Sequence, residues 1–145
     1  MHRLIYICQR YTTMADRWKK SNKSIYNLGY HLIWCPKYRR KVLVDQVGTR
    51  LIELLKEIAS SIDCSIETME IMPDHVHIFV KSSPIHSPHY IVAQLKGRSS
   101  HTLRQEFPHL KKRLPTLWTR SYFAESVGCI SEEVVKKYID NQKKN

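Results

Sequence analysis

The apolar residues of this chain recur at two different spacings, and the spacing changes several times along the sequence. Four stretches are short and rich in β-branched and aromatic residues, and three of them are followed directly by proline or glycine. Such stretches are typical of β-strands bounded by turns. They predict strands over residues 26–35, 65–72, 75–81 and 122–127.

Helical spacing appears in the segments between and after these strands. Asp45 is placed to cap a helix whose apolar positions recur every three or four residues, at Leu51, Leu54, Leu55, Ile58 and Ile62. Ser87 and Pro88 form a good N-cap and first turn for a second helix. A last helix begins at about residue 131, with two glutamates first and two lysines later, a polarity that complements the helix dipole.

The predicted order is β-α-β-β-α-β-α. It indicates an α+β fold with an antiparallel sheet and helices on one face, as in ferredoxin-like and RRM-like folds. A chain of 145 residues has room for one domain with one core. We assign that domain to residues 24–145 and treat residues 1–23 as an N-terminal extension of unknown role.

The apolar stretches are too short to span a bilayer or to form a secretory signal, so we expect a cytoplasmic protein without a membrane partner. The four cysteines include no C-x-x-C pair, which argues against a zinc knuckle. Reduced, partly buried cysteines are the expected state in that compartment.

The net charge of +11 changes this picture, because polyanion binding is the commonest use of so large a surplus. The basic residues are spread through the predicted domain instead of gathering in a tail. That distribution favours a nucleic-acid-binding face, although a basic surface that serves only solubility stays an alternative.

The clearest local motif is His75-Val76-His77 on the third predicted strand. Residues two apart on a strand point to the same face, so both imidazoles leave the face opposite the core close enough to share a metal ion. A pair of histidines on a half-exposed strand, taken alone, more often binds no metal. A second pattern places Tyr138 and Gln142 one turn apart on the last helix, where packing plus a surface amide would explain them equally well.

Four stretches taken together resemble one known family, the small single-tyrosine transposases of bacterial and archaeal insertion sequences (the insertion sequence 200/605 group), which are HUH nucleases. The similarity covers the chain from about residue 24 onward. The stretches resemble, in order, the family's first strand and basic loop, its metal strand, its second helix and the segment before its tyrosine helix. They are residues 30–41 (YHLIWCPKYRRK), 73–80 (PDHVHIFV), 95–100 (LKGRSS) and 118–123 (WTRSYF).

The resemblance implies roles for four residues. Tyr138 matches the nucleophile that leaves a 5′-phosphotyrosine and a free 3′-hydroxyl, His75 and His77 match the metal ligands, and Gln142 matches an additional ligand. A shell of two imidazoles and one amide suits Mg²⁺ or Mn²⁺. The resemblance also implies single-stranded DNA with hairpins at the element ends as substrate. It further implies a homodimer in which the tyrosine helix of one chain acts on its partner's histidines.

Seven basic residues are candidates for phosphate contacts, with ordinary solubility as the alternative for each: Lys37, Arg39, Arg40, Lys41, Lys96, Arg98 and Arg120. Tyr38, Trp118 and Tyr122 are candidates for stacking on bases, although burial is favoured for Trp118 and Tyr122. Asp74 could orient the metal site, but a turn-capping aspartate is the favoured interpretation.

Two competing functions stay open at this point. A domesticated relative that only holds DNA or RNA hairpins would need none of the four matched residues. A replication initiator or relaxase would use the same chemistry, but the short chain and the absence of a second tyrosine close to Tyr138 favour the transposase.

Overall fold

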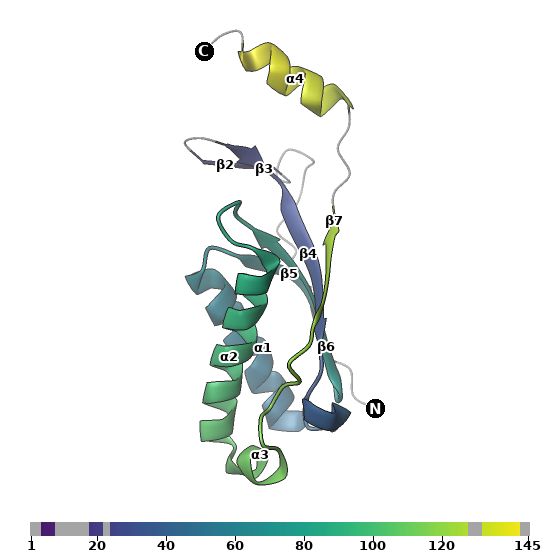
Figure 1. Cartoon of the computed structure of the whole chain (residues 1–145), viewed down its shortest axis with the longest axis vertical. Helices are drawn as coiled ribbons and strands as arrows, with labels where there is room; N and C mark the ends of the chain where they lie inside the picture. The colour runs from purple at the N-terminus through teal and green to yellow at the C-terminus, as the bar shows by residue number, and fades with distance from the viewer. Residues whose placement is uncertain (1–3, 8–17, 22–23, 128–131, 143–145) are drawn as a thin grey trace.

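A computed structural model of the chain describes residues 4–7, 18–21, 24–127 and 132–142. A five-stranded antiparallel sheet carries the long helices α1 and α2 on one face (Figure 1). Its strands follow the order β1-β5-β6-β4-β7. They are β1 (Leu4–Ile7), β4 (Leu28–Trp34), β5 (Ser65–Met72), β6 (His75–Ser82) and β7 (Phe123–Val127).

The other elements lie around this sheet. The helices are α1 (Asp45–Ser61), α2 (Pro88–Glu106), α3 (Pro108–Arg113) and α4 (Glu132–Gln142), and a 3₁₀ turn, η2 (Lys37–Arg39), follows β4. The short strands β2 (Lys19–Lys20) and β3 (Ile25–Tyr26) pair with each other as a separate two-stranded sheet. Figure 1 shows α4 beyond the end of the main sheet where β3 leads into β4.

The predicted fold class and element order are confirmed. The order β4-α1-β5-β6-α2-β7-α4 reproduces the predicted series, and β5 has the predicted bounds. Ser87 caps α2 as expected, because its hydroxyl accepts a hydrogen bond of 3.1 Å from the backbone N–H of Tyr90. Among the described residues, none of the helices combines the length and apolar character needed to cross a bilayer.

The predicted cap of α1 is wrong. Val44 occupies the N-cap position with extended backbone angles, and no side-chain hydrogen bond closes the helix end. Asp45 is instead the first helical residue and has a left-handed φ of 52°. A residue that caps a helix with its side chain usually has extended backbone angles and lies one position before the first helical residue. Asp45 meets neither condition. Its carboxylate still lies in the first turn, where it complements the dipole.

The structure adds elements that the apolar spacing did not predict. The first of them, β1, comes from the predicted N-terminal extension and pairs with the outer edge of β5. The predicted strand over residues 26–35 is divided into β3 and β4 at Asn27. A short helix, α3, follows α2 directly.

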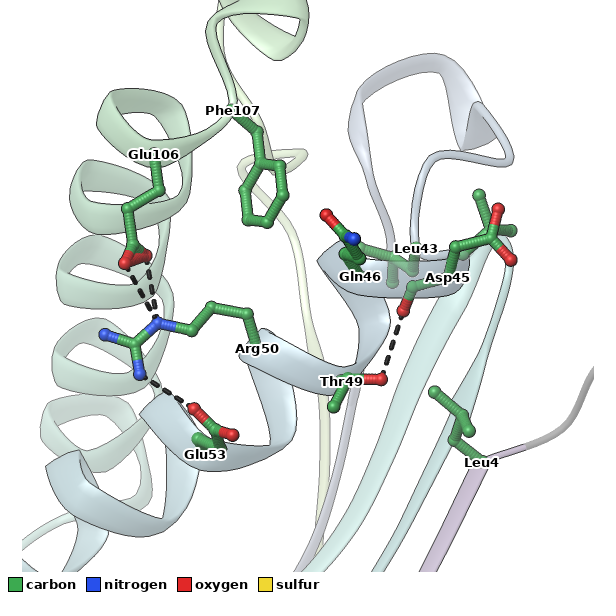
Figure 2. A pocket seen from close by; sticks show the side chains of 10 residues that line it. Leu4, Leu43, Asp45, Gln46, Thr49, Arg50, Glu53, Glu106 and Phe107 are labelled. Carbon is green, nitrogen blue, oxygen red and sulfur yellow. Dashed lines mark hydrogen bonds and ion pairs between the residues drawn. The ribbon is translucent and has the colours of Figure 1, made fainter.

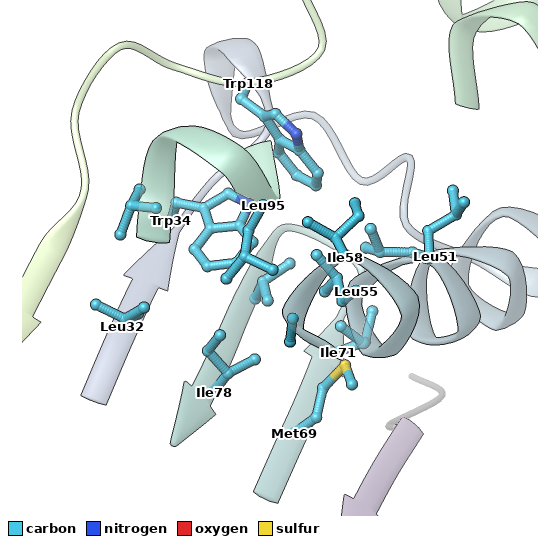
Figure 3. Packing of buried hydrophobic residues seen from close by; sticks show 14 of the residues in the cluster. Leu32, Trp34, Leu51, Leu55, Ile58, Met69, Ile71, Ile78, Leu95 and Trp118 are labelled. Atoms are coloured by element: carbon cyan, nitrogen blue, oxygen red, sulfur yellow. The ribbon is translucent and has the colours of Figure 1, made fainter. Parts of the chain in front are cut away.

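The core lies between the sheet and α1 and α2 (Figure 3). Alternate residues of β6 are fully buried in it, namely Val76, Ile78 and Val80. The Trp34 and Trp118 rings meet edge to face with centroids 5.9 Å apart, and the Trp118 Nε1 donates to the backbone oxygen of Lys96 at 3.0 Å. Because α1 and α2 cover one face only, the intervening residues of β4 and β6 lie on the opposite, open face of the sheet.

Candidate active site

The open face of β6 carries both predicted histidines. His75, His77 and Phe79 are half-buried and alternate with the fully buried core residues, as the two-residue period predicts. Across the sheet His77 lies opposite Glu70 of β5 and Ile33 of β4. Within the described residues, no three histidine, cysteine or acidic side chains form a ready metal cluster.

Asp74 contacts one ring nitrogen of His75. Its Oδ1 lies 2.9 Å from the His75 Nδ1, and its Oδ2 accepts a 2.8 Å bond from the Arg39 Nη2. The hydrogen bond from His75 lowers the pKa of the Asp74 carboxyl, and Arg39 lowers it further. Metal-binding histidines commonly have one ring nitrogen fixed by a carboxylate in this way, which orients the other nitrogen toward the metal. Asp74 thus has a contact beyond the turn-capping interpretation, and the Nε2 of His75 is the nitrogen left for a ligand.

His31 holds the second histidine, a role that no local pattern in the sequence predicts. The His31 Nδ1 lies 3.2 Å from the His77 Nε2, and the His31 ring also packs on Phe79 with centroids 4.9 Å apart. Burial lowers the pKa of His77, and the neighbouring His31 acts in the same direction. The neutral imidazole is therefore favoured, and that is the form that binds metals. The two-residue period of β4 puts His31 on the open face, but only the register between β4 and β6 places it beside His77.

The donor chemistry of this pair fits a divalent metal ion. Asp74 fixes the Nδ1 of His75 and leaves its Nε2 for a ligand, and the half-buried His77 has a lowered pKa that favours its neutral form. Nitrogen donors of this kind bind Mn²⁺ better than Mg²⁺, since Mg²⁺ prefers oxygen.

Tyr138 and Gln142 do not join the histidines within one chain. Both lie on α4 and are exposed, with 47% of the Tyr138 surface accessible. His75 begins β6 at the end of the sheet that carries η2, whereas α4 lies beyond the opposite end (Figure 1). The structure of a single chain therefore brings His75 and His77 together but keeps the other two matched residues apart from them.

The basic loop over residues 37–41 lies beside the start of β6. Arg39 joins the two through Asp74, and the backbone N–H of Leu43 donates to the oxygen of Pro73 at 3.1 Å. Tyr38 and Arg39 have left-handed φ angles of 59° and 51°, and the Tyr38 side chain is 65% exposed. The Lys37 ammonium lies 5.5 Å from the centroid of the Tyr38 ring. The loop thus presents an aromatic ring and several cations next to the histidines.

The other basic candidates lie elsewhere. The Lys96 ammonium donates to the backbone oxygens of Thr119 at 2.6 Å and Ser121 at 3.2 Å, and burial lowers its pKa. Arg98 is exposed on α2 and donates to the Ser61 hydroxyl at 2.7 Å. Lys96 therefore ties α2 to the chain before β7, and both residues belong to the helical layer behind the sheet. Exposed Arg120 comes just before β7.

The remaining aromatic and cysteine expectations are mostly met. Trp118 is buried and Tyr122 is half-buried, with its hydroxyl 2.9 Å from the Nδ1 of His89. Cys35 and Cys64 are free thiols, and burial raises the pKa of Cys64, which favours its protonated form. The other two cysteines, at positions 8 and 129, lie outside the described residues.

A cavity of about 660 Å³ lies between the start of α1 and the end of α2, and its lining contains neither His75 nor His77 (Figure 2). Its lining includes Arg50, whose guanidinium is bonded to Glu106 at 2.9 Å and to Glu53 at 2.9 Å. Both carboxylates therefore compensate the arginine. Phosphate binding would have to displace these contacts, so we do not place the substrate here.

Sequence comparison identifies relatives over most of the chain. The model of the IS200-like transposases matches residues 24–142. The ISDra2 transposase TnpA of Deinococcus radiodurans is 37% identical over 134 residues, which cover 91% of this chain and 96% of that protein. The transposase for insertion sequence element IS200 of Salmonella typhimurium is 29% identical over 119 residues, covering 81% of this chain and 78% of that protein.

Two solved structures are also similar to this chain. A crystal structure of a transposase from Deinococcus radiodurans has a TM-score of 0.71 and 38% identity, covering 86% of this chain and 97% of its own. A REP-associated tyrosine transposase bound to a REP hairpin has a TM-score of 0.56 at 11% identity, over 84% and 68% of the two chains, and shows the shared fold alone. The family match over most of the sequence, together with the 37% identity to ISDra2 TnpA, shows that this chain belongs to the IS200-like transposases of the insertion sequence 200/605 group.

Proposed function

We propose that this IS200-like transposase cuts and rejoins single-stranded DNA at the ends of an insertion sequence through a covalent link to Tyr138. The observation that carries the proposal is the prepared histidine pair on β6, with His75 held by Asp74 and His77 held by His31. A protein that only bound hairpins would need no such arrangement. Family membership supports the transposase class.

The proposed cleavage step transfers one phosphoryl group of the DNA backbone from a 3′ oxygen to the tyrosine oxygen. The phenolic oxygen of Tyr138 attacks the scissile phosphorus, the bond from phosphorus to the 3′ oxygen breaks, and that oxygen leaves with a proton as a free 3′-hydroxyl. The phenol proton must be removed, because a free tyrosine has a pKa of about 10. The phosphate stays attached to the protein as a 5′-phosphotyrosine, so a second 3′-hydroxyl can reverse the step on another end without ATP.

We assign the metal site to His75 and His77, with Gln142 as an oxygen donor. A bound Mg²⁺ or Mn²⁺ would polarise a phosphate oxygen and help to orient the scissile group. Asp74 and His31 keep the two imidazoles in place. The loop over residues 37–41 lies beside them and supplies cations for the phosphates on either side.

A cleavage assay tests this function directly. The protein is incubated with Mn²⁺ and single-stranded element ends that include their hairpins, and denaturing gels reveal any protein joined to DNA. Tyr138→Phe should abolish the adduct while leaving DNA binding nearly intact, because only the hydroxyl is lost. Tyr90→Phe is the matched control, since Tyr90 is also exposed on a helix but lies on α2. Equal adduct from wild type and Tyr138→Phe would refute the nucleophile.

Metal dependence is measured in the same assay. EDTA, His75→Ala and His77→Ala should each remove cleavage. Binding of single strands should also weaken with salt, because phosphate contacts release counterions at a log-log slope of roughly 0.7 per contact. Cleavage that persists in EDTA would exclude the metal role of the histidines.

The separation of α4 from the histidines supports a site shared between two chains of a homodimer. Tyr138→Phe and His77→Ala proteins, each inactive alone, should regain cleavage when combined in one dimer. One site then pairs intact histidines with an intact tyrosine, and the other site is doubly broken. Mixed dimers without activity on a single-site substrate would show that the two sites are not shared in this way.

A further inference from the structure

The contact between His31 and His77 joins two potential metal ligands across neighbouring strands. The His31 Nδ1 lies 3.2 Å from the His77 Nε2, and the ring centroids are 5.3 Å apart. A hydrogen bond between them requires that one nitrogen carries a proton and the other accepts it. When both rings carry their proton on the far nitrogen, two lone pairs face each other instead. Two lone pairs at this separation are the arrangement that a shared metal ion needs.

The distance between the two nitrogens matches that of neighbouring ligands in a coordination shell. Bonds from a metal ion to imidazole nitrogen are about 2.1 Å long. An ion at that distance from both nitrogens would have a nitrogen–metal–nitrogen angle of about 100°, given their 3.2 Å separation. This angle lies between those of octahedral and tetrahedral shells. An ion therefore fits between His31 and His77 with little movement of either ring.

The fold holds the His31 ring in position for this role. The register of β4 and β6 places His31 opposite Phe79 and Ile33 opposite His77. The His31 ring packs on the Phe79 ring with centroids 4.9 Å apart. Gly29, two residues before His31, makes room for this packing, since a Cβ there would lie 2.7 Å from the Phe79 ring. Imidazoles that are already fixed in this way lose little freedom when they bind a ligand.

An orienting role, in which His31 only holds His77, is the alternative. The outer partners of metal-binding histidines are usually carboxylates, backbone carbonyls or waters, as Asp74 is for His75. An imidazole in that place is itself one of the commonest metal ligands. The two roles also use different nitrogens of His77. In the orienting role His31 engages the Nε2 and leaves only the Nδ1 for the metal, whereas in the chelating role the Nε2 itself binds.

We propose that His31 is a further ligand of the metal ion, which it binds through its Nδ1 together with the Nε2 of His77. The proposal rests on the proposed function, because it takes His75 and His77 to be the metal site. No three histidine, cysteine or acidic side chains among the described residues form a ready cluster. The His75 side chain, which is 35% exposed, must therefore turn toward the pair when the ion binds. Three imidazoles make the site favour Mn²⁺ over Mg²⁺, which prefers oxygen ligands.

NMR of the wild-type protein with labelled histidine nitrogens tests the ligand without reference to cleavage. One equivalent of Zn²⁺ is added as a diamagnetic probe, and the ring nitrogens are assigned through bonds. The signals of the His31 Nδ1 and the His77 Nε2 should shift together to the range of metal-bound nitrogen. A shift at His75 or His77 with an unchanged His31 Nδ1 would overturn the proposal and leave the metal site standing. No shift at any of the three histidines would instead refute the metal site of the proposed function.

Calorimetric titration of variants with Mn²⁺ and Mg²⁺ supplies the second arm. His31→Phe keeps a ring that can pack on Phe79 but removes both nitrogens. Its Mn²⁺ affinity should fall more than about 100-fold, beyond the roughly 10- to 100-fold that follows the loss of an outer partner. Its Mg²⁺ affinity should fall less, because Mg²⁺ gains little from imidazole. His31→Asn, whose amide keeps a weak donor near the position of the Nδ1, should recover part of the Mn²⁺ affinity.

His89→Phe is the matched control for these variants. The His89 Nδ1 also contacts a side chain, the Tyr122 hydroxyl at 2.9 Å, but on α2 and away from β6. Its Mn²⁺ affinity should equal that of the wild type, and urea denaturation checks that each variant is folded. A fall of 100-fold or less in His31→Phe, or an equal fall for both metals, would overturn the role of His31 as a ligand.

Discussion

Asp74→Asn tests the proposed metal site at His75 and His77. The substitution keeps the size of the side chain but removes the charge that joins Arg39 to His75. An amide orients the imidazole less firmly and makes its far nitrogen a weaker donor. Losing such a partner typically reduces metal affinity 10- to 100-fold, which is about 1.4–2.7 kcal/mol. We expect Mn²⁺ to bind to this variant more weakly by that factor.

The same substitution should hardly affect folding. The Arg39 side chain is 72% exposed, and exposed ion pairs contribute only about 0–1 kcal/mol to the free energy of unfolding. The loss of metal affinity should therefore exceed the loss of stability. A mainly structural role for Asp74 would reverse this order.

Two measurements separate these outcomes. Calorimetric titration with Mn²⁺ gives the affinity, and urea denaturation of the metal-free protein gives the free energy of unfolding. Glu57→Gln is the matched control, because Glu57 is an exposed carboxylate on α1, in the layer behind the sheet. Arg39→Gln should weaken Mn²⁺ binding less than Asp74→Asn, since the bond between Asp74 and His75 survives. An Mn²⁺ affinity within twofold of wild type in Asp74→Asn would refute the positioning role.

Three further predictions concern the framework and its pH dependence. Trp118→Ala should lower the free energy of unfolding in urea by about 3–5 kcal/mol, because it leaves a cavity and removes the bond to Lys96; a loss below 1 kcal/mol would contradict this packing. Gly29→Ala should cost about 1–3 kcal/mol and shift the His31 ring signals in NMR spectra, because the added Cβ would lie 2.7 Å from the Phe79 ring that packs on His31; unchanged spectra would count against it. The pKa of Asp74 is held below its usual value of about 4, so its stabilising contribution is complete above that pH and is lost as the pH falls through the lowered pKa. Wild type and Asp74→Asn should therefore converge in stability in acid, and a gap that widens there would contradict the sign.

Local patterns in the sequence predicted the framework well because each rests on a short-range rule. The two-residue period placed Val76, Ile78 and Val80 in the core and His75 and His77 on the open face. The prediction that Asp45 caps α1 was wrong because Asp45 has a left-handed φ angle. The preference of aspartate for N-cap positions does not reveal that angle. The strand β1 escaped notice because four apolar residues carry too little periodicity to distinguish a strand from a loose extension.

The candidate site required long-range information as well. His31 lies 46 positions from His77, and only the pairing of β4 with β6 brings their rings together. Arg39 and Lys96 looked alike as candidate phosphate contacts. In the fold, Arg39 supports the turn before His75, and Lys96 bonds to backbone oxygens behind the sheet. Composition reveals such cations but not the groups that the fold places around them.

The left-handed turn at Tyr38 and Arg39 also bears on how this protein would respond to engineering. A side chain in that backbone region costs roughly 1–2 kcal/mol per residue, whereas glycine adopts it freely. Variants selected only for thermal stability should therefore accumulate glycine at these two positions. Selection for DNA cleavage should retain the ring and the guanidinium, so the two libraries would diverge at this loop first. A transposase stabilised by glycine at these two positions would then cleave DNA less well, and the loss of activity would be due to Tyr38 and Arg39.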